Sequence, residues 1–262
     1  MLSCFFILSI IMKKVINLYK PVGLTPLQAL EKFKDNNSAY RGKKMSYPGR
    51  LDPMAEGILI VLVGDENKKM EQYMKLDKEY IAQILFGFNS DSHDVLGIPN
   101  RGERKEIDDK TLKKKIKSFK GDYDMKVPVF SSIRVKGKAL LNYARRGKLD
   151  KIEIPRFRVR IKSIFIDNIY EISGRRLLKE ILKKINMVKG DFRQDEIKTR
   201  WRLLLNGSEE KFKVVKIYVK CSSGTYIRAI ARDVGMELGG GILLSLMRTK
   251  VGMIDIKDSV RI

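Results

Sequence analysis

The amino-acid sequence predicts an α+β domain with a mixed, largely antiparallel central sheet and flanking helices. Segments with strand patterns and segments with helix patterns are interspersed without a regular strand–helix alternation, and nothing repeats at a fixed period. The chain also has no glycine-rich phosphate loop and no dinucleotide-binding fingerprint. These observations favour an antiparallel α+β arrangement over a doubly wound fold, and 262 residues suffice for a full core.

Apolar runs and the residues that interrupt them locate the strands. A buried strand is expected over 58–63, because an unbroken apolar run there is bounded by Gly57 and Gly64. Alternating basic and apolar residues over 157–166 predict a half-buried strand with a basic outer face. The other expected strands are 15–19, 79–86, 214–221 and a closing strand at 251–256.

Helices are expected between these strands. Thr25 can cap a helix that begins at Pro26 and places Leu30 and Phe33 on one face. A basic helix is expected over 110–119. The last two expected helices are 229–238, which ends at a glycine triplet, and 242–248.

Asp52 lies at the centre of the most constrained stretch of the chain, residues 47–57. Gly49 permits backbone conformations that a side chain would obstruct, and Pro53 biases the residue before it away from helix. Asp52 is therefore expected on an extended or turning loop at the rim of the strand that follows. Asp-Pro is also a common turn dipeptide, so the local sequence leaves a purely structural role open.

The net charge points to a polyanionic partner. The chain has 54 Lys and Arg against 31 Asp and Glu, a formal charge of +23, which is far beyond what solubility requires. Nucleic acid is the first candidate, and an anionic membrane surface or a ribosomal contact is the second. The apolar segment 1–12 is too short to span a bilayer and lacks the basic residues that precede the core of a signal peptide. We therefore expect no membrane association.

One basic segment, residues 131–149, contains no acidic residue at all. Its apolar residues give it some helical character, so a basic hairpin or a loop followed by a helix is expected to lie against phosphates. A solvated basic face is the alternative. The cations expected to bind RNA are Arg134, Lys136, Lys138, Arg145 and Arg146.

The residues that usually hold metals are scarce. Cys4 and Cys221 are far apart and His93 is the only histidine, so neither a zinc site nor a disulfide framework is expected, and a reducing cytoplasm fits. The loop at 89–97 has two carboxylates three residues apart but lacks the glycine and glutamate spacing of an EF-hand calcium loop. We predict no metal and no cofactor.

The predicted catalytic domain covers residues 14–262, with one segment before it and one insertion within it. The apolar extension 1–13 is interpreted as an upstream start codon read in error, with Met12 as the working start. Residues 172–213 break the strand pattern, contain a basic helical stretch and the only tryptophan, and are interpreted as an inserted basic lobe.

Taken together, several stretches resemble the bacterial tRNA pseudouridine synthases of the TruB family, which modify the T-loop uridine at tRNA position 55. Their order and spacing make the joint match strong. They are KPVGLT at 20–25, GRLDPMAEG at 49–57, KEY at 78–80 with SDSHD at 90–94, and GTYIR at 224–228; VPVFSS at 127–132 with RVKG at 134–137 also resembles the family's substrate-gripping segment. The resemblance implies the pseudouridine synthase fold, with a catalytic cleft across a mixed sheet.

The resemblance also implies roles for individual residues. Asp52 is the catalytic aspartate, Tyr80 the active-site tyrosine, and Arg228 the guanidinium that fixes the direction of Asp52. The reaction cleaves the bond between ribose and uracil N1, rotates the base and rejoins it through C5, with Asp52 as nucleophile or base. The substrate-binding residues are Tyr47, Arg50, Tyr226, Leu246, Lys20 and the five basic residues named above.

The chain departs from the family pattern in three places. Tyr47 and Pro48 stand where histidine and threonine are usual, so Tyr47 is expected to stack on or hydrogen-bond to the flipped base. Arg50 stands where a small residue is usual, and its charge could add a phosphate contact or perturb the acid. The chain also ends where many relatives continue into a C-terminal RNA-binding domain of the PUA type, and the predicted lobe at 172–213 could compensate.

The sequence therefore predicts a monomeric, cytoplasmic tRNA pseudouridine synthase that acts on the T arm by base flipping. The alternatives are a non-catalytic RNA-binding or tRNA-folding factor that keeps the fold, and a basic ribosome-associated protein. The last of these has no use for Asp52, Tyr80 and Arg228 together.

Overall fold

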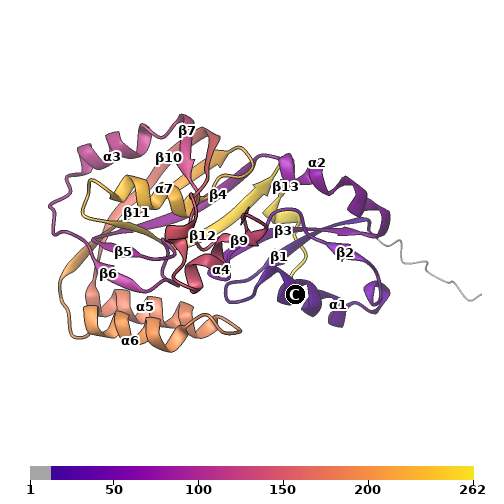
Figure 1. The fold of residues 1–262 in the computed structure, drawn as a ribbon, viewed down its shortest axis with the longest axis horizontal. Helices are drawn as coiled ribbons and strands as arrows, with labels where there is room; N and C mark the ends of the chain where they lie inside the picture. Colours follow the sequence, from indigo (N-terminus) through magenta and orange to yellow (C-terminus); the bar gives the residue numbers. More distant parts are fainter. Residues whose placement is uncertain (1–12) are drawn as a thin grey trace, which may run out of the picture.

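The computed structural model describes residues 13–262 (Figure 1). The predicted N-terminal extension thus lies, except for Lys13, outside the described residues. The helices are α1 (Pro26–Asn36), α2 (Met70–Lys75), α3 (Asp109–Lys117), α4 (Leu140–Arg145), α5 (Gly174–Met187), α6 (Gln194–Leu205) and α7 (Ile227–Gly235). The strands are β1 (Val15–Lys20), β2 (Met45–Ser46), β3 (Ala55–Val63), β4 (Lys78–Phe86), β5 (Phe88–Ser90), β6 (Pro99–Arg101), β7 (Gly121–Lys126), β8 (Arg134–Val135), β9 (Lys138–Ala139), β10 (Arg156–Ser173), β11 (Lys211–Cys221), β12 (Gly241–Val251) and β13 (Ile254–Asp255).

One large sheet forms the frame of the molecule. Its strand order is β1-β3-β12-β4-β11-β10-β7, with β2 beside β3 and β13 beside β12. Every pair is antiparallel except β12 and β3, which run parallel. The predicted α+β class with a mixed, largely antiparallel central sheet is confirmed.

Helices cover both faces of the sheet in its β4–β11–β10 half (Figure 1). On β4, neighbouring residues alternate between faces: Ile84 packs in the cluster with α3 and α7, whereas Leu85 packs in the cluster with α5 and α6. Trp201 of α6 is fully buried in the second cluster and lies against Phe88. This half of the sheet is therefore a three-layer structure.

Burial of both faces also explains the apolar run in β3. Leu59 and Val61 pack with α1, whereas Ile58 and Ile60 belong to a cluster that includes residues of α2. A strand covered on both faces has no polar side, so its sequence is continuously apolar rather than alternating. Thr25 caps α1 as expected, through a reciprocal pair of hydrogen bonds with Gln28.

The prediction of a helix at 242–248 is wrong, because these residues form the middle of β12. This strand lies between β3 and β4, and Leu246 pairs with Ala55 on one side and Ala82 on the other. Leucine and methionine favour helix only weakly, and pairing with two neighbouring strands in the centre of a sheet overrides that preference. Glycines 239 and 240, both with positive φ, direct the chain from α7 into the strand.

Residues 172–213, predicted to form an inserted lobe, are largely helical. Strand β10 continues to Ser173 and its antiparallel neighbour β11 starts at Lys211, so α5 and α6 form the connection between two adjacent strands. The two helices lie side by side against the sheet (Figure 1). We call α5, α6 and the loop between them the α5–α6 hairpin.

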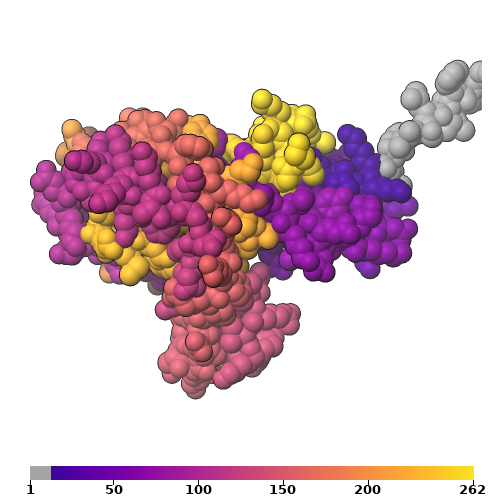
Figure 2. All heavy atoms as spheres, turned by 90° about the horizontal axis from the view of Figure 1, so that it is seen from above, coloured from indigo at the N-terminus to yellow at the C-terminus, as the bar shows by residue number. Residues whose placement is uncertain are grey.

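The basic segment projects from the body of the molecule. Residues 131–155, called the arm here, form the rose and salmon lobe of Figure 2. Strands β8 and β9 pair through a two-residue turn in which Lys136 and Gly137 both have positive φ, as tight hairpins require, and α4 follows. The expected hairpin and helix are both present.

No helix within residues 13–262 is both long enough and apolar enough to cross a membrane.

Gly57 marks the closest approach between β3 and β12. Its φ is +106°, and an added Cβ would lie 2.2 Å from the carbonyl oxygen of Arg248. Gly57→Ala should lower the free energy of unfolding by roughly 3 kcal/mol, since the backbone strain and the overlap add. Gly64→Ala is the matched control, because Gly64 also has positive φ but open space around it, and should cost about 1–2 kcal/mol. Equal losses in urea unfolding would contradict the close approach.

Candidate active site

Asp52 lies on an irregular loop that leads into β3, as expected, and the backbone of that loop is held on several sides. The carbonyl of Asp52 accepts a hydrogen bond from the amide of Ala55 at 3.0 Å, and the carbonyl of Pro53 accepts one from the amide of Gly23 at 2.8 Å. Gly49 has φ of +81°, a conformation that glycine adopts without strain. The aspartate is thus carried by a fixed backbone.

Arg248 binds the backbone of the same loop from its buried side. Its guanidinium is 1% exposed and donates to three carbonyls, those of Ile58 at 2.8 Å, Gly49 at 3.2 Å and Arg50 at 3.4 Å. A buried guanidinium is tolerated only where its donors are satisfied, and carbonyl oxygens provide this here. Arg248 therefore ties the loop to the junction of β3 and β12.

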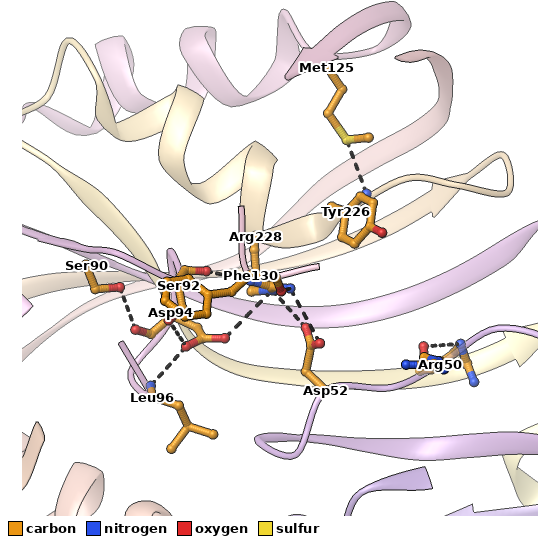
Figure 3. Close-up of polar contacts among 11 residues, drawn as sticks. Arg50, Asp52, Ser90, Ser92, Asp94, Leu96, Met125, Phe130, Tyr226 and Arg228 are labelled. Carbon is orange, nitrogen blue, oxygen red and sulfur yellow. Dashed lines mark hydrogen bonds and ion pairs between the residues drawn. The ribbon is translucent and has the colours of Figure 1, made fainter. Parts of the chain in front are cut away.

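Arg228, in the first turn of α7, is the centre of the polar contacts around Asp52 (Figure 3). It is 3% exposed, and its Nε lies 2.8 Å from Oδ2 of Asp52, with Nη2 3.4 Å from Oδ1. Nη1 donates to the carbonyl of Ser92 at 2.6 Å, and Nη2 also donates to the carbonyl of Phe130 at 3.1 Å. The guanidinium thus fixes the direction of the Asp52 carboxylate, which is 37% exposed and can reach a ligand.

Asp94 is a second carboxylate beside Arg228, at 3.7 Å from its Nε. It is almost fully buried, and it accepts hydrogen bonds from the Ser92 hydroxyl at 2.6 Å and the Leu96 amide at 2.9 Å. Burial raises the pKa of Asp94 to about 6, while the positive charge of Arg228 acts in the opposite direction. Asp94 therefore helps to neutralise Arg228 from the interior side.

Two tyrosines and a leucine form the walls around Asp52 and Arg228. Tyr80 comes from β4, Leu246 from β12, and Tyr226 immediately precedes α7. Burial raises the pKa of Tyr80 to about 12 and also raises the pKa of Tyr226. Both phenols are consequently neutral at physiological pH and can act as apolar rings with a hydroxyl donor.

These groups border a cavity of about 1080 Å³. A carboxylate with a fixed direction, facing a cavity with aromatic walls, can act as a nucleophile or base toward a planar substrate. Within residues 13–262, no group of three histidine, cysteine or acidic side chains is arranged to hold a metal ion. The predicted site residues that line the cavity are Tyr47, Arg50, Asp52, Tyr80, Arg145, Tyr226, Arg228 and Leu246.

Lys20, expected to bind substrate, lies beneath the surface instead of in the cavity. It has no exposed surface, and its ammonium donates to the carbonyls of Pro21 at 2.9 Å and Leu24 at 2.8 Å. Burial lowers the pKa of Lys20 to about 7, and the nearby charge of Asp52 partly offsets this effect. In this position Lys20 stabilises the turn between β1 and α1, and it does not face the cavity.

The other predicted binding residues lie on the arm. Arg134, Lys136, Lys138 and Arg146 are exposed and do not line the cavity. None of them pairs with an acidic side chain in the described part of the chain. The basic face of β10 differs, since Arg156, Arg158 and Arg160 pair with acidic residues of β7. The arm thus carries exposed positive charges that acidic partners like those on β7 do not neutralise.

Several residues of the site have no clear signal in the sequence. Asp94 stands out there as half of a poor calcium loop and as the last residue of the SDSHD stretch that resembles the family, but neither signal indicates its contact with Arg228. Arg248 was hidden by the wrong helix prediction. The carbonyl groups of Ser92 and Phe130 leave no signal in side-chain chemistry, although both lie in stretches that resemble the family.

Comparisons with known proteins identify the family of this chain. Residues 37–192 match the family described as TruB family pseudouridylate synthase (N terminal domain). The chain is 32% identical, over 96% of its length and 72% of the relative's, to tRNA pseudouridine synthase B of Clostridium tetani, and 30% identical, over 92% and 86%, to the protein of that name from Endomicrobium trichonymphae.

Solved structures with the same fold include the Cbf5-Nop10-Gar1 complex. The match has a TM-score of 0.59 at 17% identity and covers 95% of this chain but 52% of that one, so the chain spans about half the length of the solved structure. At this level of identity the likeness shows the fold alone. With a family match over more than half of its residues and a relative covered over most of its length, the chain belongs to the TruB family of pseudouridylate synthases.

Proposed function

We propose that this protein isomerises uridine to pseudouridine at position 55 in the T loop of tRNA, with Asp52 as the catalytic carboxylate. The observation that carries the proposal is the ion pair between Arg228 and Asp52 at 2.8 Å, at the wall of a cavity lined by Tyr80 and Tyr226. Family membership supports the reaction, and the names of the relatives support tRNA as the substrate.

The reaction requires a group that attacks or deprotonates at the ribose while the bond to uracil N1 breaks. Asp52 can do either, because its carboxylate is exposed to the cavity and Arg228 fixes its direction. The ring of Tyr80 can stack on the detached uracil. Its neutral hydroxyl can take part in transferring the proton that leaves C5. The product is an isomer of the substrate, so the reaction consumes and releases nothing overall, and none of these steps calls for a cofactor.

The T-loop uridine must leave its stack to reach Asp52, at a cost of about a few kcal/mol. The arm can offset this cost, since its unpaired cations can contact backbone phosphates beside the cavity while Arg145 lines the cavity itself. Tyr47 and Arg50 also line the cavity, which supports their proposed contact with the flipped nucleotide. A monomeric, cytoplasmic enzyme remains the prediction.

A non-catalytic RNA-binding protein is the second candidate. Such a protein would benefit from the arm, but it has no use for a buried guanidinium held by two carbonyls and directed at an exposed carboxylate. The site geometry therefore favours the enzyme.

Asp52→Asn should abolish pseudouridine formation while leaving tRNA binding nearly intact. The amide keeps the shape of the side chain but removes the charge that acts on the ribose, so the single-turnover rate on an unmodified tRNA transcript should fall ~10⁴-fold or more. Asp258→Asn is the matched control, since Asp258 is exposed and does not line the cavity. A chemical assay that finds product from Asp52→Asn at the wild-type rate would rule out the assignment.

The combined replacement of Arg134, Lys136 and Lys138 with alanine should weaken tRNA binding and flatten its salt dependence. Removing one phosphate-binding cation should reduce the slope of log K against log salt by about 0.7 to 0.9, so the triple variant should reduce it by roughly 2 to 3. The control replaces Lys110, Lys113 and Lys114, which are exposed on α3 and do not line the cavity. Equal slopes for both triple variants would show that the arm makes no particular contact with RNA.

A further inference from the structure

The loop between α5 and α6 reaches the rim of the cavity that contains Asp52. Asp191, Phe192 and Arg193 of this loop line the cavity. The loop is anchored to the turn after β1, because the amide of Lys189 donates to the carbonyl of Gly23 at 2.9 Å. The α5–α6 hairpin thus covers one face of the sheet and also completes one side of the site.

Arg193 makes two contacts at this rim, each to a different segment. Its Nη1 lies 2.8 Å from Oδ2 of Asp91, in the loop between β5 and β6, and its guanidinium carbon lies 4.9 Å from the ring centre of Phe130, at the root of the arm. Its backbone has φ of +63°, which residues other than glycine seldom adopt. The side chains of Arg193 and Asp91 are 34% and 33% exposed, so the pair is partly shielded from water.

The two segments that Arg193 contacts are the ones that orient Arg228. The Arg228 guanidinium is held by the carbonyl of Ser92, which follows Asp91 directly, and by the carbonyl of Phe130. These segments come from separate parts of the chain. Arg193 holds them together on the outer side, whereas Arg228 holds them together on the inner side.

We propose that Arg193 is a positioning residue for the isomerisation: it clamps the Asp91 and Phe130 segments so that their neighbouring carbonyls aim Arg228 at Asp52. This inference rests on the proposed function. If the clamp is released, the two carbonyls can move relative to each other, and the Arg228 guanidinium turns with them. Because misplacement of a catalytic group by about 1 Å can cost about 10²-fold in rate, a clamp outside the reacting groups can control the reaction.

An arginine suits this clamp because it can pair with a carboxylate through one nitrogen while its planar face lies over an aromatic ring. A lysine can supply a cation to both partners with poorer geometry. A methionine of similar length supplies no charge. The two substitutions therefore separate loss of the positive charge from loss of the planar guanidinium.

The test compares Arg193→Met, Arg193→Lys and the control Arg202→Met, in which an exposed arginine of α6 that does not line the cavity is replaced. Single-turnover pseudouridine formation and the salt dependence of tRNA binding are measured for each, with thermal unfolding as the check on folding. Arg193→Met should be about 10- to 100-fold slower with unchanged affinity and salt slope. Arg193→Lys should recover most of the rate, and Arg202→Met should match the wild type.

Three results would overturn the inference. A wild-type rate for Arg193→Met would show that the clamp is not needed. Weaker binding with a salt slope reduced by about 0.7 to 0.9 would make Arg193 a phosphate contact instead. An equally slow Arg193→Lys would show that the bridging cation is not the cause. Failure of the wild type itself to form pseudouridine would contradict the proposed function, and is distinguishable because it appears before any variant is compared.

Discussion

The ion pair between Arg228 and Asp52 is the interaction on which the site depends. Arg228 is buried, so its charge must be met by Asp52, Asp94 and two carbonyl oxygens. These partners come from three separate parts of the chain, because Asp94 and the Ser92 carbonyl share one loop. Removing a partner from such a buried group is unfavourable, which keeps the contacts together. The exposed Asp52 carboxylate thus gains a fixed direction from a network that lies mostly below the surface.

The sheet brings these partners to one place. Strand β12 enters between β3 and β4, which sets Leu246 beside the Asp52 loop and places Arg248 under it. Gly57 permits the approach of β12 to β3, because any side chain there would meet the Arg248 carbonyl. The arm projects from the body of the molecule (Figure 2), and its Arg145 lines the same cavity as Asp52.

Local signals predicted much of this from the sequence. The Asp52 loop, the buried β3, the capped α1 and the hairpin of the arm all follow from short-range patterns of glycine, proline and apolar residues. Strand β12 was missed because its apolar residues enter buried clusters on both faces of the sheet and therefore show no alternation. The role of Asp94 was missed because its contact with the distant Arg228 has no local signature. The contact of Arg193 with Phe130 depends on packing of the α5–α6 hairpin, which no short window of sequence encodes.

The most direct test of the central interaction is the single-turnover rate of Arg228→Lys on an unmodified tRNA transcript. Lysine keeps the charge beside Asp52 but cannot bind both carboxylate oxygens and two carbonyls in one plane. The geometry described here predicts a rate about 10²-fold lower with tRNA affinity retained. A rate equal to that of the wild type would show that charge alone suffices and that the direction of the Asp52 carboxylate is not set by Arg228.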